Sequence, residues 1–335
     1  LQFQLAITEA CNFNCINCYD SEAHHNHKEK LNKELNIEQK KQLINYLHEW
    51  GGVLLFQWSG GEPLLSKDLK EVVECANKKM FVQSLLTNGA RLIDESVARW
   101  VAKSFARVQV SFSAVDNFKK WSGVDKFQIL MQGLKNVQKY CAKSNSSLNI
   151  TTTVNEISVA ELDKIAFWVN KINPTHWRIG EEVPLGKAEK NSHHIKILED
   201  SYKIFIKLKK QYRKKNWHHC FEIEEADTVF PIEWQSSPAG RTMLYMSANG
   251  EIYPFPYLKM PEFRLGKFPE DDIKDIWFNS PILKKLRSVK YNDTDCKKCN
   301  NICVRWAREI SYHFNKKLTE SPSPFTNCPR KEVGI

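Results

Sequence analysis

The sequence lacks the features that would place the chain in a membrane or on a secretion route. Among its 335 residues there is no run of about 18 apolar residues, which excludes an ordinary membrane-spanning helix. The first residues show no basic segment followed by an apolar stretch, so no signal peptide is predicted. Internal repeats and low-complexity tracts are also absent. These absences predict a cytoplasmic protein with no membrane partner.

A disulfide framework is also absent, although the chain has ten cysteines. Such frameworks belong to short secreted chains, in which cysteines are spread through the sequence. Here seven of the ten gather in two regions: Cys11, Cys15, Cys18, Cys296, Cys299, Cys303 and Cys328. Close groups of thiols in a long chain without a signal peptide indicate metal binding in a reducing compartment.

The composition is that of a folded protein with a basic surface. Hydrophobic residues make up 42% of the chain, enough for a large core, and the length fits one large domain or two unequal ones. The net charge is +10, and much of it lies in 207–219 and 284–290. Such stretches can attract nucleic acid or an acidic peptide, but a solvated helix face is the simpler interpretation. No aromatic RNA-binding signature accompanies them, so nucleic acid is not an expected partner.

The first 190 residues alternate apolar runs with helical patterns. This alternation predicts six β-α units, with parallel strands joined by right-handed crossovers. In such folds the loops at the carboxyl ends of the strands carry the chemistry. The expected strands cover 3–8, 53–58, 80–87, 105–113, 148–154 and 176–180, and the expected helices cover 37–50, 67–78, 93–103, 127–142 and 159–170.

The remainder of the chain has a different character. A basic helix is expected at 198–215, a hairpin over 242–255 about Asn249–Gly250, and a helix at 273–289. The predicted organisation is a barrel domain over 1–190, a helical bridge over 191–235 and a small cysteine-bearing domain over 236–335.

The first cysteine group follows the first strand in the sequence "CNFNCINCYD". Three thiolates spaced C-x3-C-x2-C can hold zinc or three irons of a [4Fe-4S] cluster. No fourth ligand follows at zinc-finger spacing. His24, His25 and His27 could complete a zinc site, but a solvated polar loop is favoured for them. A cluster with three protein thiolates leaves one iron open to a ligand from outside the protein.

At this point the chain resembles the radical S-adenosylmethionine (SAM) enzymes, whose hallmark is C-x3-C-x2-C after the first strand of a partial (β/α)6 barrel. The other landmarks of that family recur in order. They are "GGEP" (Gly60–Pro63), "TNG" (Thr87–Gly89), "SFS" (Ser111–Ser113) and "PLGKA" (Pro184–Ala188). The fold class implied is α/β, a partial (β/α)6 TIM-like barrel followed by a small iron–sulfur domain.

The resemblance implies an enzyme that uses a [4Fe-4S] cluster and SAM to make a 5′-deoxyadenosyl radical, which abstracts hydrogen from an unactivated C–H bond. It also implies an electron donor of the flavodoxin or ferredoxin type. Two positions depart from the family pattern: Asn17 stands where an aromatic residue is common, and Ser113 where an acidic one is usual. The implied cofactor-binding residues are Tyr19, Gly60, Gly61, Glu62, Pro63, Thr87, Asn88, Ser111, Ser113 and Arg178.

The C-terminal part resembles the SPASM domain, which holds two auxiliary [4Fe-4S] clusters in many peptide-modifying radical SAM enzymes. Laid on that pattern, Ser237, Phe255 and Ala307 replace the cysteines of the cluster nearer the barrel. The ligands of the distal cluster remain, as Cys296, Cys299, Cys303 and Cys328. The resemblance therefore implies one auxiliary [4Fe-4S] cluster, while zinc bound by the same four thiols stays an alternative.

The expected reaction is the modification of a peptide or protein side chain, by crosslinking or oxidation, and this rests on the family analogy. Three alternatives stay open: a small-molecule dehydrogenase or sugar-modifying enzyme, a peptide epimerase, and a non-catalytic metal-bearing binding protein. Cys220, in "WHHCFEIEEAD", is the candidate hydrogen donor for an epimerase, although a buried inert thiol is the simpler interpretation.

Overall fold

The computed structural model describes residues 1–20, 33–183, 185–190, 194–220 and 237–288. The chain divides into two compact units. The barrel unit comprises Gln4–His219 with Ser247–Asn249, and the C-terminal unit comprises Leu1–Phe3, Cys220–Met246 and Gly250–Ile335. Within the described residues, every helix is too short or too polar to cross a membrane.

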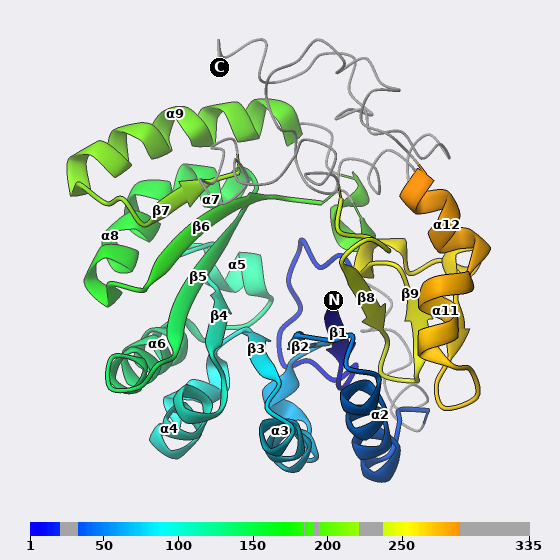
Figure 1. Ribbon diagram of the computed structural model, residues 1–335. Helices are drawn as coiled ribbons and strands as arrows, with labels where there is room; N and C mark the ends of the chain where they lie inside the picture. Colours follow the sequence, from blue (N-terminus) through cyan, green and yellow to red (C-terminus); the bar gives the residue numbers. More distant parts are fainter. Residues whose placement is uncertain (21–32, 184, 191–193, 221–236, 289–335) are drawn as a thin grey trace. The chain divides into compact units, whose positions relative to one another are not determined.

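Seven strands lie side by side, in chain order, in the barrel unit (Figure 1). From β2 to β7 each pairs with the next in parallel. Their carboxyl ends therefore all lie at one edge, where the sequence predicts the functional loops. The strands are β1 (Gln2–Ala6), β2 (Leu55–Ser59), β3 (Val82–Thr87), β4 (Arg107–Ser111), β5 (Ser147–Val154), β6 (His176–Glu181) and β7 (Trp217–His219).

Helices connect these strands, and Figure 1 shows α3, α4, α6 and α8 along one side of them. The first long helix has clear local signals: Asn36 and Gln39 form a capping box, and Gly51 ends the helix in the left-handed conformation. The helices are α2 (Ile37–Trp50), α3 (Leu69–Lys78), α4 (Glu95–Ser104), α5 (Phe118–Ser122), α6 (Phe127–Cys141), α7 (Glu156–Ala160), α8 (Leu162–Ile172) and α9 (His194–Tyr212). Three 3-10 turns accompany them: η2 (Pro63–Leu65), η3 (Ala90–Ile93) and η4 (Gly186–Lys190).

The core lies between the strands and these helices. In β5, "SLNITTTV", every second residue is buried, and the apolar Leu148 and Ile150 are fully buried. The intervening side chains lie on the opposite face, which we call the inner face. Strand register places Gln109, Asn149 and His176 in one row of that face. It is polar and partly exposed, as expected for strands whose two faces differ in burial.

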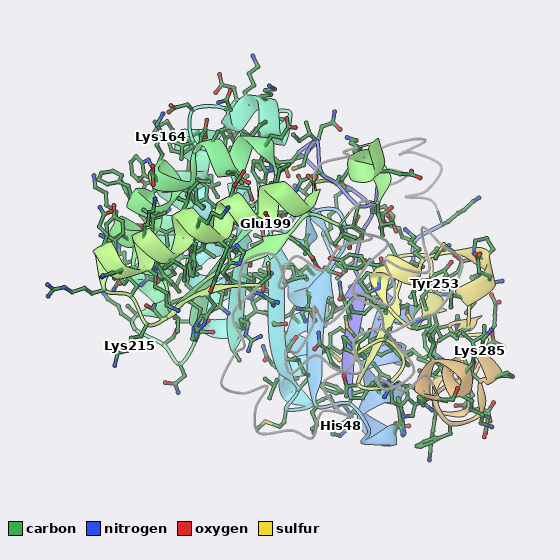
Figure 2. The ribbon with its side chains drawn as sticks, turned by 90° about the horizontal axis from the view of Figure 1, so that it is seen from above. His48, Lys164, Glu199, Lys215, Tyr253 and Lys285 are labelled. Atoms are coloured by element: carbon green, nitrogen blue, oxygen red, sulfur yellow. The ribbon has the colours of Figure 1, made fainter. Side chains whose placement is uncertain are left out.

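Helix α9 is the basic helix predicted from the sequence. Its buried side includes Phe205 and Leu208, whereas Lys203, Lys207 and Lys210 are exposed. Figure 2 shows Glu199 near its start and Lys215 beyond its end. The lysines thus form a solvated face, and those in the last turn lie where the helix dipole favours cations.

The C-terminal unit contains an antiparallel hairpin, in which Tyr245 of β8 (Met243–Met246) pairs with Tyr253 of β9 (Glu251–Tyr253). Two residues of β10 (Gly266–Lys267) extend this hairpin. Phe255, which replaces a cysteine of the SPASM pattern, is buried and packs edge-on against Tyr257 at 5.1 Å between ring centroids. The remaining elements are η6 (Pro256–Leu258), η7 (Pro261–Phe263), α11 (Ile273–Asn279) and α12 (Pro281–Ser288).

The predicted α/β barrel topology is confirmed, and all six predicted strands are present. Several short elements were missed, namely strands β7 and β10 and helices α5 and α7. The single helix predicted over 273–289 is wrong: α11 ends at Asn279 and α12 begins at Pro281, because proline lacks the N–H that a continuous helix needs. The predicted domain limits at 190 and 235 stay a prediction.

Candidate functional site

The three cysteines of the first group lie on the loop that follows β1, at the carboxyl edge of the parallel strands. Cys11, Cys15 and Cys18 are half-buried and form no disulfide. Burial raises the pKa of Cys11 to about 11, and the negative charge of Cys18 adds to that rise. Burial raises the pKa of Cys15 to about 12, and the charges of Cys11 and Cys18 reinforce it. The three sulfurs thus lie close enough to interact electrostatically.

The first half of this loop is held by the "GGEP" segment after β2. The amide of Gly61 donates to the carbonyl of Thr8 at 2.8 Å, and the amide of Glu62 donates to the carbonyl of Ala10 at 2.7 Å. Gly60 has a φ of +132°, and a Cβ placed there would come within 2.3 Å of the Thr8 carbonyl oxygen. Only glycine allows this close approach of two backbones.

The Glu62 side chain is fully buried and joins the ends of β2 and β3. Its carboxylate accepts hydrogen bonds from the Thr87 hydroxyl at 2.7 Å, the Asn88 amide at 2.7 Å and the Leu64 amide at 3.0 Å. Burial raises the pKa of Glu62 to about 7, against the effect of these three donors. The carboxylate is therefore a structural latch, which fixes the two strand ends beside the cysteine loop.

Asn88 connects that latch to the cysteine loop. Its side-chain amide donates to the side-chain oxygen of Asn12 at 2.7 Å, and its own oxygen accepts from the Ala90 amide at 3.0 Å. A further hydrogen bond between Asn88 and Cys11 opposes the rise in the pKa of that thiol. The "GGEP" and "TNG" segments therefore act together on the part of the loop that carries Cys11.

Helix α5 holds the middle of the loop. The amide of Asn14 donates to the Ser122 carbonyl at 2.8 Å, and the amide of Ile16 donates to the Trp121 carbonyl at 3.0 Å. These bonds bracket Cys15. A five-residue helix is too short for a periodic signal in the sequence. Gly123, which ends the helix with a φ of +76°, is the local feature that could have indicated it.

The segment after β6 holds the last part of the loop. The amide of Lys187 donates to the Cys18 carbonyl at 3.0 Å, and the Lys187 ammonium donates to the side-chain oxygen of Asn14. Gly186 has a φ of +59°, and a Cβ there would lie 2.5 Å from the Tyr19 carbonyl oxygen. Each cysteine is thus supported by a different β-α unit.

The remaining residues discussed as SAM contacts are Ser111, Ser113 and Arg178, and they differ in burial. Ser111 is exposed at the end of β4, whereas Ser113 is buried and accepts a hydrogen bond from the Thr153 amide at 2.9 Å. Arg178 is half-buried on the inner face of β6, in register with Thr151 of β5. Their assignment to SAM stays a prediction.

The second cysteine group cannot be placed in the same way. Cys296, Cys299, Cys303 and Cys328 lie outside the described residues, as does Ala307. Cys220 is described: it is half-buried, forms no disulfide and follows the last residue of β7.

The cysteine loop fits a [4Fe-4S] cluster better than a single ion. In the described ranges, no three His, Cys, Asp or Glu side chains surround one point closely enough for a single metal ion. A four-iron cluster binds each thiolate at a separate iron, so its ligands must surround a space several ångströms wide. Three half-buried thiols on a loop held from three sides meet that need.

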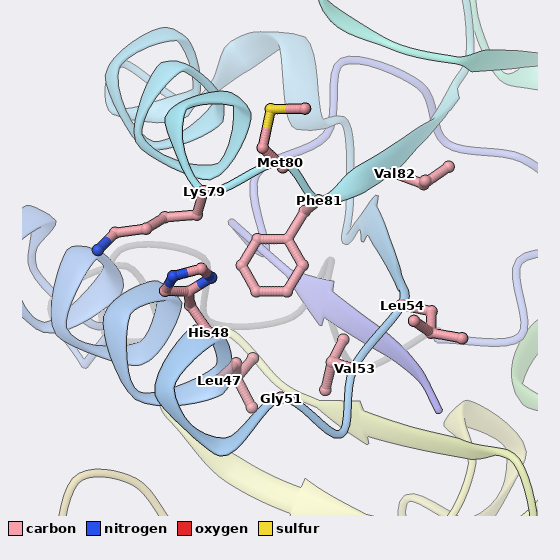
Figure 3. Close-up of a pocket in the computed structure, with 9 residues that line it drawn as sticks. All are labelled: Leu47, His48, Gly51, Val53, Leu54, Lys79, Met80, Phe81 and Val82. Carbon is pink, nitrogen blue, oxygen red and sulfur yellow. The ribbon is translucent and has the colours of Figure 1, made fainter.

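One pocket lies at the other end of the strands and takes no part in this arrangement. It is lined from α2, the start of β2 and the turn between α3 and β3, and Figure 3 shows Phe81 and His48 facing each other across it. Its mouth exposes Leu54 and Met80. The wall is mainly apolar, and His48 and Lys79 are its polar side chains.

Comparison with known proteins supports the iron–sulfur interpretation of the cysteine loop. The family model described as the radical SAM superfamily matches residues 5–169, and that of an iron-sulfur cluster-binding domain, SPASM, matches 238–300. The chain is 23% identical to the AdoMet-dependent heme synthase of Methanosarcina barkeri, over 88% of this chain and 86% of that protein. It is 22% identical to the mycofactocin maturase MftC of Mycobacterium tuberculosis, over 84% of this chain and 71% of that protein.

Solved structures show the same fold. SuiB of Streptococcus suis, in its crystal structure with S-adenosylmethionine, matches 96% of this chain and 73% of its own with a TM-score of 0.72 and 16% identity. These matches confirm the predicted cofactors, which are a [4Fe-4S] cluster, SAM and auxiliary iron–sulfur chemistry in the C-terminal domain. The chain belongs to the radical SAM superfamily and is an enzyme with a C-terminal SPASM domain.

Proposed function

We propose that this radical SAM enzyme oxidises or crosslinks a side chain of a peptide or protein. The observation that carries the proposal is the inner face of β4 to β6, where Gln109 lies in register with Asn149, and Ser111 with Thr151. These amides and hydroxyls can both donate and accept hydrogen bonds. An extended peptide presents one donor and one acceptor per residue, so such a face suits it.

Two relatives support a peptide substrate. The maturase MftC is named for maturation of mycofactocin, and SuiB has been crystallised bound to its precursor peptide SuiA. In contrast, the heme synthase relative and the GTP 3′,8-cyclase of Mannheimia succiniciproducens, which is 25% identical over 75% of this chain and 76% of that protein, are named for small molecules. The polar inner face of this chain favours a peptide substrate over a small molecule.

In the proposal, Cys11, Cys15 and Cys18 hold the [4Fe-4S] cluster. When bound, that cluster and SAM supply the 5′-deoxyadenosyl radical. The chain's own part is to fix the three thiols through the three supports described above and to present the substrate from the inner face. Cys296, Cys299, Cys303 and Cys328 are proposed to hold one auxiliary cluster, and a flavodoxin or ferredoxin to supply electrons.

The test uses anaerobically reconstituted enzyme with SAM, dithionite and synthetic peptides encoded beside its gene. We expect one peptide to lose two hydrogen atoms: one goes to 5′-deoxyadenosine, and the second leaves as a proton to water and an electron to the proposed auxiliary cluster. Deuterium placed on the peptide should appear in 5′-deoxyadenosine. The matched control is Cys11→Ser, which removes one proposed ligand and should abolish SAM cleavage.

Other outcomes would redirect the proposal. Deuterium transfer from a small molecule, with no peptide changed in mass, would favour the small-molecule alternative. A peptide that keeps its mass in H2O but gains one deuterium in D2O would favour the epimerase alternative, for which the half-buried thiol of Cys220 is the specific observation. In that case Cys220→Ala should still cleave SAM but should no longer give the inverted product.

A further inference from the structure

Lys187 contacts the cysteine loop in two ways. Its amide donates to the Cys18 carbonyl at 3.0 Å, and its ammonium donates to the side-chain oxygen of Asn14, the residue before Cys15. Gly186 brings this segment into place, since its left-handed backbone lets it pack against the carbonyls of Cys18 and Tyr19. One lysine thus connects the segments that carry two of the three cysteines.

The charges around the three thiols are unequal. The Lys187 ammonium bonds to Asn14, next to Cys15. On the side of Cys11, the residue with a buried carboxylate is Glu62, whose amide bonds to the carbonyl of Ala10. Glu34 also faces the loop, where its carboxylate accepts from the Glu9 amide at 2.7 Å. Lys187 therefore places a positive charge beside a loop that also faces the carboxylates of Glu34 and Glu62.

We propose that Lys187 is a positioning residue that favours the reduced form of the cluster held by Cys11, Cys15 and Cys18. This inference rests on the proposed cluster ligation. Its basis is the placement of the Lys187 side chain, whose ammonium bonds to Asn14 next to Cys15 and whose backbone amide bonds to the Cys18 carbonyl.

The physical reason is the change in charge on reduction. Reduction adds one electron to the cluster, so a nearby cation stabilises the reduced form more than the oxidised one. The thiols are half-buried but the ammonium is exposed at Asn14, so water and salt screen part of the interaction. Loss of the cation should lower the ratio of reduced to oxidised cluster at a fixed potential by roughly threefold, which is about 28 mV for a one-electron couple.

The test is a redox titration of reconstituted enzyme without SAM, followed by the EPR signal of the reduced cluster. To keep that signal free of the auxiliary site, all proteins carry Cys296→Ser and Cys299→Ser. Lys187→Met removes the charge but keeps the length of the side chain, and we expect its midpoint to move to a lower potential. Lys187→Arg keeps the charge and should retain the midpoint of the parent protein.

Two further variants separate charge from contact. Asn14→Ala removes the hydrogen-bond acceptor but leaves the ammonium, so it should shift the midpoint much less than Lys187→Met. Lys103→Met removes an exposed lysine of α4 and should leave the midpoint unchanged. Equal shifts in Lys187→Met and Asn14→Ala would overturn the role of the charge.

Other results also decide the question. An unchanged midpoint in Lys187→Met, or equal shifts in Lys187→Met and Lys187→Arg, overturns the inference and leaves the proposed function intact. If Lys187→Met and Lys187→Gln fail to retain iron while Lys187→Arg retains it, the need for a charge is supported; iron loss in all three overturns it. Absence of any cluster signal in the parent protein would instead be a failure of the proposed ligation.

Discussion

The two ends of the parallel strands in the barrel unit are built in different ways. At the carboxyl ends, backbones approach closely, and a buried carboxylate and an asparagine join three segments around the cysteine loop. At the amino ends, apolar side chains line a pocket, and Leu54 and Met80 are 74% and 87% exposed. Geometry is thus specified by hydrogen bonds where a cofactor must be held, while the other end relies on apolar packing.

In this chain the apolar pocket is a poor guide to the position of the proposed cofactor site. The pocket of Figure 3 is lined mainly by apolar side chains, with His48 and Lys79 as its polar ones. The cysteine loop instead receives polar contacts from the segments after β2 and β3, from α5 and from η4. The predictions below test whether the carboxyl end depends on those contacts as strongly as its structure indicates.

The largest effect is expected for the latch at the carboxyl end. Glu62→Ala leaves the Thr87 hydroxyl and the Asn88 and Leu64 amides without their acceptor. Buried donors without a partner are costly, so we expect the free energy of unfolding at pH 8 to fall by about 3 kcal/mol. Chemical denaturation of the apoprotein measures this. The control is Glu74→Ala on the exposed side of α3, expected within about 0.5 kcal/mol.

Glu62→Gln should lower the free energy of unfolding by a smaller amount than Glu62→Ala. The glutamine keeps one oxygen but turns an amide NH2 toward the remaining donors, so an intermediate loss of about 1–2 kcal/mol is expected. If Glu62→Ala proved as mild as Glu74→Ala, the carboxyl end would not depend on its latch, and the contrast between the two ends would fail.

The second effect concerns pH and the carboxyl end of β7. His219 is buried, its Nε2 lies 2.9 Å from the Ser201 hydroxyl, and burial lowers its pKa to about 3. The unfolded chain binds this proton near pH 6.5. His219 therefore contributes its full stability above pH 6.5, and that contribution is lost as the pH falls toward 3.

Between pH 6.5 and pH 5 we expect a loss of about 2 kcal/mol from this residue. Denaturant unfolding at several pH values measures the slope, and His219→Gln should remove this part of it, since glutamine does not titrate. His176→Gln, at an exposed position on β6, should leave the slope nearly unchanged. Equal slopes in all three proteins would show that His219 is not held neutral.

The third effect uses two glycines that differ in surroundings. Gly186→Ala places a Cβ 2.5 Å from the Tyr19 carbonyl oxygen at a φ of +59°. We expect a loss of about 1–2 kcal/mol in stability, together with reduced iron retention after reconstitution. Gly180→Ala is the matched control, because its Cβ meets nothing within 4 Å. Equal iron content in both variants would contradict a supporting role for the segment after β6.

Much of the carboxyl end was predictable from the sequence. The spacing of Cys11, Cys15 and Cys18 and the order of "GGEP", "TNG" and "PLGKA" identify the family, because each motif has a local chemical signature. The alternation of apolar runs and helical patterns predicted the six strands. These features are local in sequence, and short windows are enough to read them.

Other parts could not be predicted, because they depend on contacts between distant residues. The bond from Asn88 to Asn12 spans 76 positions, and that from Lys187 to Asn14 spans 173. The resemblance implies that Glu62 and Thr87 contact the cofactor, which stays a prediction, but it does not predict the hydrogen bond between their side chains. Helix α5 is too short for a periodic signal, and β7 has three residues. Tertiary context decides such elements.

The smallest effect is expected at the amino end, at Met80. This residue has a φ of +62°, a left-handed conformation that costs a residue with a Cβ about 1 kcal/mol. Its side chain is 87% exposed, so removing it sacrifices little packing. Met80→Gly should relieve the strain but lose more chain entropy on folding, for a net gain of about 0.5 kcal/mol. Met80→Ala keeps the Cβ and should gain nothing. Denaturant midpoints of both variants measure the difference, with iron content after reconstitution unchanged. If Met80→Gly instead lowered iron content as Gly186→Ala is expected to, the amino end would be coupled to the cysteine loop, and the two ends could no longer be treated as independent.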